Sequence, residues 1–205
     1  MFNKDHFYQR APIWLQHIMV SIYGIYWRWA RFGGDYSKHL NAYKDRETYS
    51  EEAWNAYQRK KLEEIISICS HQVPYYQNQW QQAEIKAAKK GDLAALPILE
   101  KNDLRQAEHL FIRKDQQPIK KFNFHTSGTT GTPIVCKYTL SELRNSLALR
   151  EARSANWAGV SFSQPRATFS GRMIEPLPER ETHIYRYNAA ENQVYFSAFH
   201  LKPST

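Results

Sequence analysis

Two glycines and five hydroxyl side chains lie together between Asn123 and Val135, flanked by apolar residues. Gly128 and Gly131 give the backbone freedom, including positive φ, so successive N–H groups can turn inward and form an anion-binding nest. The hydroxyl groups add hydrogen-bond donors and belong to Thr126, Ser127, Thr129, Thr130 and Thr132. Each hydrogen bond to a charged oxygen contributes about 1.5–3 kcal/mol, so a few of them hold a nucleotide tail. The segment predicts a strand, a phosphate-binding loop and a second strand.

The eight residues from Thr126 to Pro133 do not form a Walker A motif, because the glycines are too close and no Gly-Lys-Ser/Thr follows. They resemble the signature loop of the AMP-forming adenylating enzymes, the acyl-CoA synthetase superfamily, whose pattern is Ser/Thr-Ser-Gly-Thr-Thr-Gly-x-Pro. The seven specified positions are matched by Thr126, Ser127, Gly128, Thr129, Thr130, Gly131 and Pro133, with Thr132 at the variable one. The alternative interpretation is a polar hairpin loop without a ligand.

Shorter patterns on both sides of the loop narrow the resemblance. Upstream, Val73-Pro74-Tyr75-Tyr76, then Leu96-Pro97, then Lys101 to Arg105 follow the order seen in the phenylacetate:CoA ligase-like branch. Downstream, residues 166–172 and 193–201 are similar to the CapK-like proteins of that branch, which are associated with capsular polysaccharide biosynthesis. The resemblance covers most of the chain.

This resemblance implies the N-terminal part of an ATP-dependent, AMP-forming carboxylate ligase. Such an enzyme adenylates a small-molecule carboxylate and passes the acyl group to a thiol such as CoA, so ATP, Mg²⁺ and CoA are the implied cofactors. Thr126 to Pro133 would hold the β- and γ-phosphates. Residues 170–172 and 197–200 would line the acyl side or are ordinary strand ends. The alternative function is a truncated, non-catalytic nucleotide-binding module.

The chain departs from the family pattern at two places. Ile134 stands after the loop proline, where many adenylating enzymes have a lysine, and Lys137 lies three residues further on. The family motifs for adenine, ribose and the C-terminal lid with its catalytic lysine do not occur before Thr205. We therefore expect residues 1–205 to be an incomplete adenylation domain without its lid, inactive alone, and no catalytic residue is assigned.

The patterning predicts an α/β fold in which N-terminal helices pack on a mixed β-sheet, as part of the large N-terminal domain of an adenylate-forming enzyme. A helical region is expected over about residues 1–110. The phosphate loop, joining two strands of the sheet, belongs to a region of about 118–205. Helix starts are indicated at Pro12, at Ser50, which precedes two glutamates, and at Thr139, which forms a capping box with Glu142.

Charge and composition exclude several classes of function. The formal charge of +8 is scattered along the chain and suits a phosphate-rich substrate, while no nucleic-acid-binding module occurs. Cys69 and Cys136 are expected to be packed core residues of a protein in a reducing compartment. The His, Cys, Asp and Glu residues show no spacing typical of a metal site. Without a visible signal peptide, a cytoplasmic location is expected. The aromatic helix over residues 13–30 could lie in a core, cover the domain, or make a weak peripheral membrane contact.

Overall fold

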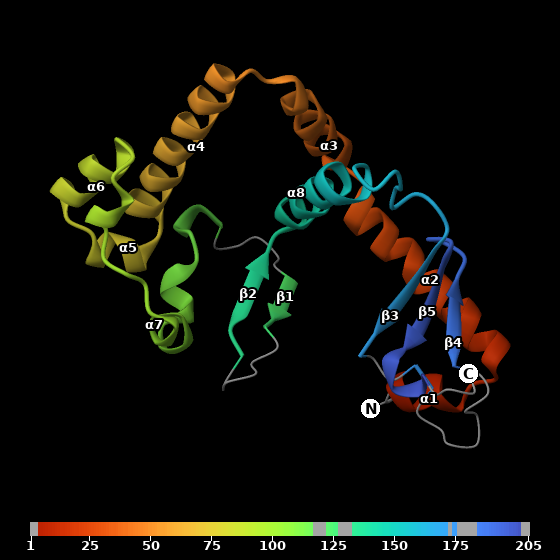
Figure 1. Cartoon of the computed structure of the whole chain (residues 1–205). Helices are drawn as coiled ribbons and strands as arrows, with labels where there is room; N and C mark the ends of the chain where they lie inside the picture. The colour runs from red at the N-terminus through yellow and green to blue at the C-terminus, as the bar shows by residue number, and fades with distance from the viewer. Residues whose placement is uncertain (1–3, 117–121, 127–132, 172–173, 176–183, 202–205) are drawn as a thin grey trace. The chain divides into compact units, whose positions relative to one another are not determined.

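The computed structural model describes residues 4–116, 122–126, 133–171, 174–175 and 184–201, and it divides into two compact units (Figure 1). Unit 1 comprises residues 1–43 and 143–205, and unit 2 comprises residues 44–142. Each unit combines helices with a small sheet. The predicted α/β class is therefore confirmed.

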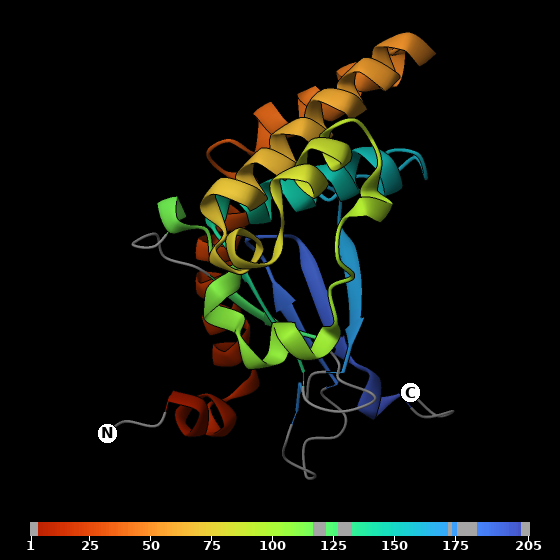
Figure 2. The same ribbon diagram turned by 90° about the vertical axis from the view of Figure 1, so that its left-hand side faces the viewer.

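Unit 1 is built on a three-stranded mixed sheet. Its helical elements are α1 (Lys4–Arg10), α2 (Ile13–Phe32), most of α3 (Tyr36–Asp45), most of α8 (Leu140–Arg150), the π-type turn η5 (Glu151–Ala155) and the 3₁₀ turn η7 (Ala198–His200). Its strands are β3 (Arg166–Ser170), β4 (Tyr185–Asn188) and β5 (Gln193–Ser197). β5 lies in the centre, parallel to β3 and antiparallel to β4. Both views show α2 along one face of this sheet, as the sequence predicts (Figures 1 and 2).

Helix α2 begins after Pro12, as predicted, and runs two residues beyond the predicted range 13–30, to Phe32, with Gly33 as its C-cap. Its glycine at position 24 allows close approach to β4, because a Cβ atom there would come within 2.1 Å of Asn188 Oδ1. The following Gly34 has φ of +54°, a conformation that favours glycine. The chain can therefore turn sharply from α2 into α3.

The contact between α2 and β4 is polar as well as tight. Gln16 of α2 accepts a hydrogen bond at Oε1 from Arg186 Nε, at 2.6 Å. Arg186 Nη2 also donates to Glu175 Oε2 at 2.6 Å, and both charged side chains are at most 1% exposed. A buried ion pair of this kind persists only when its charges are matched by hydrogen bonds. The pair and Gln16 together fix the position of α2 on the sheet.

Unit 2 begins with the long helix α4 (Glu51–Gln72), whose first turn is capped as predicted: Ser50 Oγ accepts a hydrogen bond from the Ala53 N–H at 3.2 Å. The helices that follow are α5 (Pro74–Gln79), α6 (Gln82–Lys89) and α7 (Lys101–Gln106), and the 3₁₀ turns are η1 (Arg46–Thr48), η2 (Leu93–Ala95), η3 (Glu108–Phe111) and η4 (Lys114–Gln116). The core contains Ile66, Ile85 and Ala88. The chain from residue 74 to 89 forms the two short helices α5 and α6, within the region expected to be helical.

The strands around the predicted phosphate loop form a sheet of their own. β1 (Phe122–His125) and β2 (Val135–Tyr138) are antiparallel, and both belong to unit 2. Our expectation that the loop joins two strands of the mixed sheet is wrong. The short connection brings β1 and β2 together as a hairpin, so within the described residues each pairs with the other and not with β3, β4 or β5.

Candidate functional site

The stem of the predicted phosphate loop is held by one residue pair beyond the hairpin. The Thr126 N–H donates to the Ile134 carbonyl at 3.0 Å, and the Ile134 N–H donates to Thr126 Oγ1 at 3.0 Å. The threonine hydroxyl therefore replaces the backbone carbonyl that would close a regular antiparallel pair. This contact fixes both ends of the segment from residue 127 to 132.

The predicted site residues are only partly described. Thr126 and Pro133 lie at the two ends of the stem, and both are exposed. Outside the described residues lie Ser127, Gly128, Thr129, Thr130, Gly131 and Thr132. The predicted flanking strands are confirmed, and phosphate binding by the loop stays a prediction. His125 is exposed and is the last residue of β1, where it pairs with Val135. A contact between His125 and phosphate stays a prediction.

A cavity of about 300 Å³ lies along β2 within unit 2. Its lining is mostly apolar, with Leu104, Phe111, Ile112, Ile134, Val135 and Cys136 contributing. At the polar side of the cavity, Lys137 of β2 forms an ion pair with Glu108 of η3. Lys137 is thus engaged with a carboxylate of its own unit.

The start of α8 adds polar groups to the wall of this cavity, and Arg113, which donates to Gln72 Oε1 and Asp115 Oδ1, also lines it. The Thr139 N–H donates to Glu142 Oε2 at 2.7 Å, and the Glu142 N–H donates to Thr139 Oγ1 at 3.2 Å. The predicted capping box is confirmed. Because these polar groups already satisfy one another, the cavity offers an apolar surface more than new hydrogen-bond partners. Sequence reasoning missed the cavity because its walls come from separate short elements.

The two stretches predicted to line the acyl side meet in unit 1. β3 and β5 run parallel, and Ser170 at the end of β3 stands opposite Ser197 at the end of β5. Ser197 is fully buried, and its Oγ accepts a hydrogen bond from the Phe199 N–H at 3.3 Å. Arg172 lies outside the described residues. In open α/β sheets, ligands bind beyond the carboxyl ends of the strands, where Ser170 and Ser197 lie. A contact of these residues with an acyl group stays a prediction.

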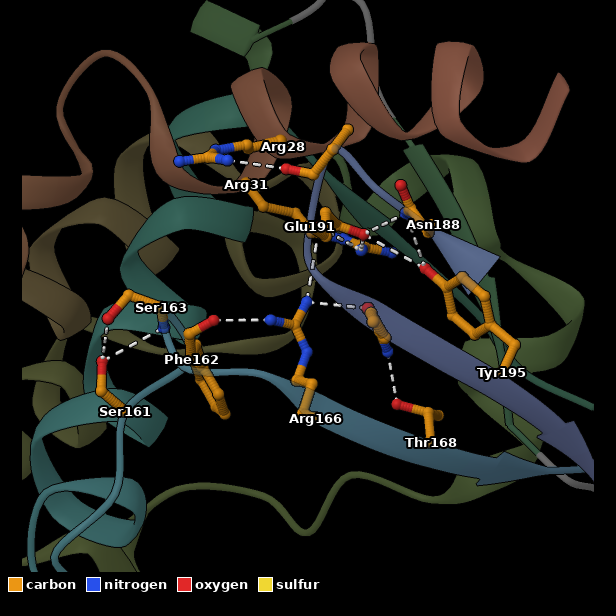
Figure 3. Close-up of polar contacts among 12 residues, drawn as sticks. Arg28, Arg31, Ser161, Phe162, Ser163, Arg166, Thr168, Asn188, Glu191 and Tyr195 are labelled. Carbon is orange, nitrogen blue, oxygen red and sulfur yellow. Dashed lines mark hydrogen bonds and ion pairs between the residues drawn. The ribbon is translucent and has the colours of Figure 1, made fainter. Parts of the chain in front are cut away.

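A buried glutamate gathers polar side chains from four elements of unit 1, α2, β3, β4 and β5 (Figure 3). Arg31 Nη1 of α2 lies 3.0 and 3.1 Å from the two carboxylate oxygens of Glu191. Asn188 and Tyr195 donate to Oε2 of this carboxylate at 3.0 and 3.1 Å, and Arg166 of β3 lies 3.6 Å from Oε1. With its charge matched on all sides, Glu191 serves as a structural centre that joins α2 to the sheet.

Beside Glu191 lies a second cavity, of about 260 Å³, between α2, α3 and the segment after η5. A second buried carboxylate, Glu151, lines it and accepts hydrogen bonds from Ser161 Oγ at 2.5 Å and from the Phe162 N–H at 2.8 Å. Burial, together with the Glu151 charge, raises the pKa of Tyr36 to about 12. The phenol therefore stays neutral at physiological pH.

Two classes of site find no support in the described part of the chain. Among those residues, no group of three or more His, Cys, Asp or Glu side chains is placed to hold a metal ion. None of the described helices combines the length and the apolar character needed to cross a membrane. Burial raises the pKa of the Cys69 thiol, which agrees with a packed and unreactive role.

The chain is similar to protein CapK of Staphylococcus aureus. The two are 23% identical over 198 residues, which is 96% of this chain and 42% of CapK. No protein-family profile and no solved structure matches the chain.

The similarity supports the predicted relationship to the CapK-like proteins over nearly the whole chain. The chain spans less than half the length of this relative. Membership of the adenylating superfamily and the ligase activity stay predictions.

Proposed function

We propose that this chain is the nucleotide-binding N-terminal part of an ATP-dependent, AMP-forming carboxylate ligase. The observation that carries the proposal is the eight-residue match from Thr126 to Pro133, placed between two antiparallel strands whose stem is fixed by the Thr126–Ile134 pair. A loop held at both ends loses less conformational entropy when it binds a ligand, because its stem is already ordered.

The chemistry of the loop suits an anionic oxygen ligand. Thr126 accepts a hydrogen bond from Ile134 at Oγ1 and keeps its hydroxyl hydrogen for donation to a second group. The other donors, from Ser127 to Thr132, are hydroxyl and backbone N–H groups, which bind phosphate oxygens by charge-assisted hydrogen bonds. When bound, ATP would supply the pyrophosphate leaving group, with Mg²⁺ neutralising its charge. The role of this chain is to bind and orient the triphosphate.

The similarity to CapK supports placing the proposed ligase in the branch that the flanking patterns indicate. A small-molecule carboxylate would be the substrate, a thiol such as CoA the acceptor, and capsule or polysaccharide biosynthesis the process served. In unit 2, the apolar cavity along β2 begins at Ile134, directly after the loop proline. It offers room for an apolar group of a ligand held by the loop.

The first test is calorimetric titration of Mg-ATP into the 205-residue chain. Binding is expected in wild type and in Thr126→Ser, which keeps the hydroxyl that accepts from Ile134. Thr126→Val removes this hydroxyl and should weaken binding about fivefold, since a hydrogen bond contributes about 1 kcal/mol. Gly128→Val should abolish binding, because a β-branched residue disfavours the positive φ of a nest. No affinity in the wild-type chain would refute the proposal.

The second test separates the ligase from a non-catalytic nucleotide-binding module. ATP–pyrophosphate exchange is measured on the protein isolated from its source cells, with a panel of small carboxylates. Exchange that depends on one carboxylate supports the ligase. ATP binding without exchange for any of the acids would refute the ligase hypothesis and favour the non-catalytic nucleotide-binding module.

A further inference from the structure

Helix α2 presents an apolar outer face that is largely exposed in unit 1, where Arg144 of α8 lies over the ring of Trp29 at one end of it, 5.2 Å from the ring centroid. Five large side chains follow one another at intervals of four, four, three and four residues: Trp14, Ile18, Ile22, Ile25 and Trp29. These intervals place them on one side of a helix. Each is between 46% and 64% exposed. We call these five residues the outer stripe.

The stripe lies on the side of α2 opposite the sheet. The sheet side carries Gln16, which bonds Arg186, and Gly24, which meets Asn188. Those contacts fix the rotation of the helix about its axis, so the outer stripe cannot turn inward without breaking them. Its exposure is therefore a consequence of how α2 is seated on β4.

The composition of the stripe and its borders suits a lipid interface. Tryptophan stands at both ends of the stripe, and the exposed tyrosines Tyr23 and Tyr26 stack beside it, with ring centroids 6.4 Å apart. Tryptophan and tyrosine are favoured where an apolar medium meets water. No charged residue interrupts the stripe, and α2 does not qualify as a membrane-crossing helix. A helix with these properties lies flat in the interface.

Charge decides which occupant fits. Unit 1 carries 13 Lys and Arg residues against seven Asp and Glu, a formal charge of +6, whereas unit 2 carries 15 against 13. Three of the acidic residues of unit 1, Glu151, Glu175 and Glu191, are buried. The exposed basic residues of this unit include Arg10, Arg28, Lys38 and Arg150. Unit 1 thus carries a net positive charge with basic side chains on its surface, and a second copy of the chain would bring like charge against it.

We propose that the outer stripe of α2 is a peripheral docking surface for an anionic lipid bilayer. Basic residues of unit 1 attract the negative surface, and each contributes to binding within about a Debye length. The stripe then buries its tryptophan and isoleucine side chains among the headgroups and upper acyl chains. The proposal is independent of the nucleotide-binding function, since the loop belongs to unit 2.

The test is flotation of the 205-residue chain with vesicles of phosphatidylcholine alone and of phosphatidylcholine with 30% phosphatidylglycerol. We expect flotation with the anionic vesicles, loss of most of it at about 0.5 M salt, and a blue shift of tryptophan emission on binding. The double variant Ile18→Ser, Ile22→Ser should lower the partition coefficient about tenfold to hundredfold. Circular dichroism verifies that the variant keeps the wild-type helix content.

The matched control is Ile65→Ser, Ile98→Ser, which removes two exposed isoleucines from unit 2 and should leave flotation unchanged. A wild-type chain that stays at the bottom with anionic vesicles would overturn the proposal, and so would equal flotation of the two double variants. Sedimentation that shows a micromolar dimer, lost in the Ile18, Ile22 variant without any vesicle binding, would assign the stripe to a second copy instead.

Discussion

Removing the charge of Glu175 should destabilise unit 1 strongly. In Glu175→Gln, the Arg186 guanidinium would lose its anionic partner at 2.6 Å while its side chain remains 1% exposed. Leaving one charge of a buried pair without its partner costs about 3–5 kcal/mol. Arg186 keeps its bonds to Gln16 Oε1 and to the Tyr185 carbonyl, at 2.6 and 2.8 Å, so we expect the lower end of this range, about 3 kcal/mol.

Urea unfolding followed by tryptophan fluorescence measures this loss, because four of the six tryptophans belong to unit 1. With a slope of about 2 kcal/mol/M, the midpoint should fall by about 1.5 M. The double variant Glu175→Leu, Arg186→Met should regain most of the loss, since it buries no unmatched charge. The control Glu64→Gln breaks the exposed pair with Lys61 and should leave the midpoint unchanged.

A midpoint for Glu175→Gln within about 0.3 M of the Glu64→Gln control would refute the reasoning, because the buried pair would then be worth no more than a surface pair. Failure of the double variant to recover stability would show that the hydrogen-bond geometry, and not the charge balance, holds α2 on the sheet.

Three further predictions concern single positions. Gly24→Ala should lower the free energy of unfolding by about 1–2 kcal/mol, because the steric cost against Asn188 exceeds the gain in helix propensity; a higher urea midpoint would contradict the close approach. The pKa of Tyr36 is raised from 10.0 to about 12, so its contribution to the free energy of unfolding is complete below pH 10 and is lost as the pH rises to about 12. Tyr36→Phe should therefore lose less stability than wild type between pH 10 and about 12, as measured by urea unfolding at each pH. Parallel stability–pH curves for the two proteins would exclude the effect. Ser50→Ala should cost about 1 kcal/mol through the cap of α4, seen as faster amide exchange at Ala53, with Ser50→Asp as the control that keeps it.

The sequence predicts most of the helix starts and the loop flanks because these depend on local chemistry. Ser50 and Thr139 accept hydrogen bonds from backbone N–H groups three residues further on, so each cap can be recognised from a short stretch of sequence. The hairpin stem likewise follows from the residues next to the loop. Where a side chain contacts residues close to it in sequence, the sequence pattern is sufficient to predict the local structure.

Two elements of unit 1 could not be predicted from periodicity. In β4, the aromatic residues Tyr185 and Tyr187 are exposed and the polar residues Arg186 and Asn188 are buried. The alternation of the sequence would therefore assign the wrong face of the strand to the core. Arg186 and Asn188 are buried because their partners Glu175, Gln16 and Glu191 come from other parts of the chain. The helix α3 lies within the region expected to be helical, but its own limits were not predicted, for a similar reason.

α3 is polar along most of its length and is held by distant groups. Tyr43 Oη donates to Asn145 Oδ1 at 3.0 Å, and Arg153 Nη2 donates to the Tyr43 carbonyl at 3.1 Å. Single-sequence patterning does not record such contacts, since they link residues more than 100 positions apart. The apolar Ile65 of α4 is exposed, so hydrophobicity alone does not identify the buried positions either. The candidate site was located by the loop motif, while its apolar cavity depends on tertiary packing.

The discontinuous make-up of unit 1 sets the order of events on the ribosome. Helix α2 ends at residue 32, and its partner strand β4 is complete only at residue 188. At roughly 5–20 residues per second, the helix waits about 8 to 30 seconds for the strand that will cover its sheet side. Unit 2, contiguous in sequence, can be complete during this interval. Until β4 emerges, the side of α2 that carries Gln16 and Gly24 lacks the strand residues Arg186 and Asn188 that it meets in the folded unit, so the packing of α2 is a late step of folding.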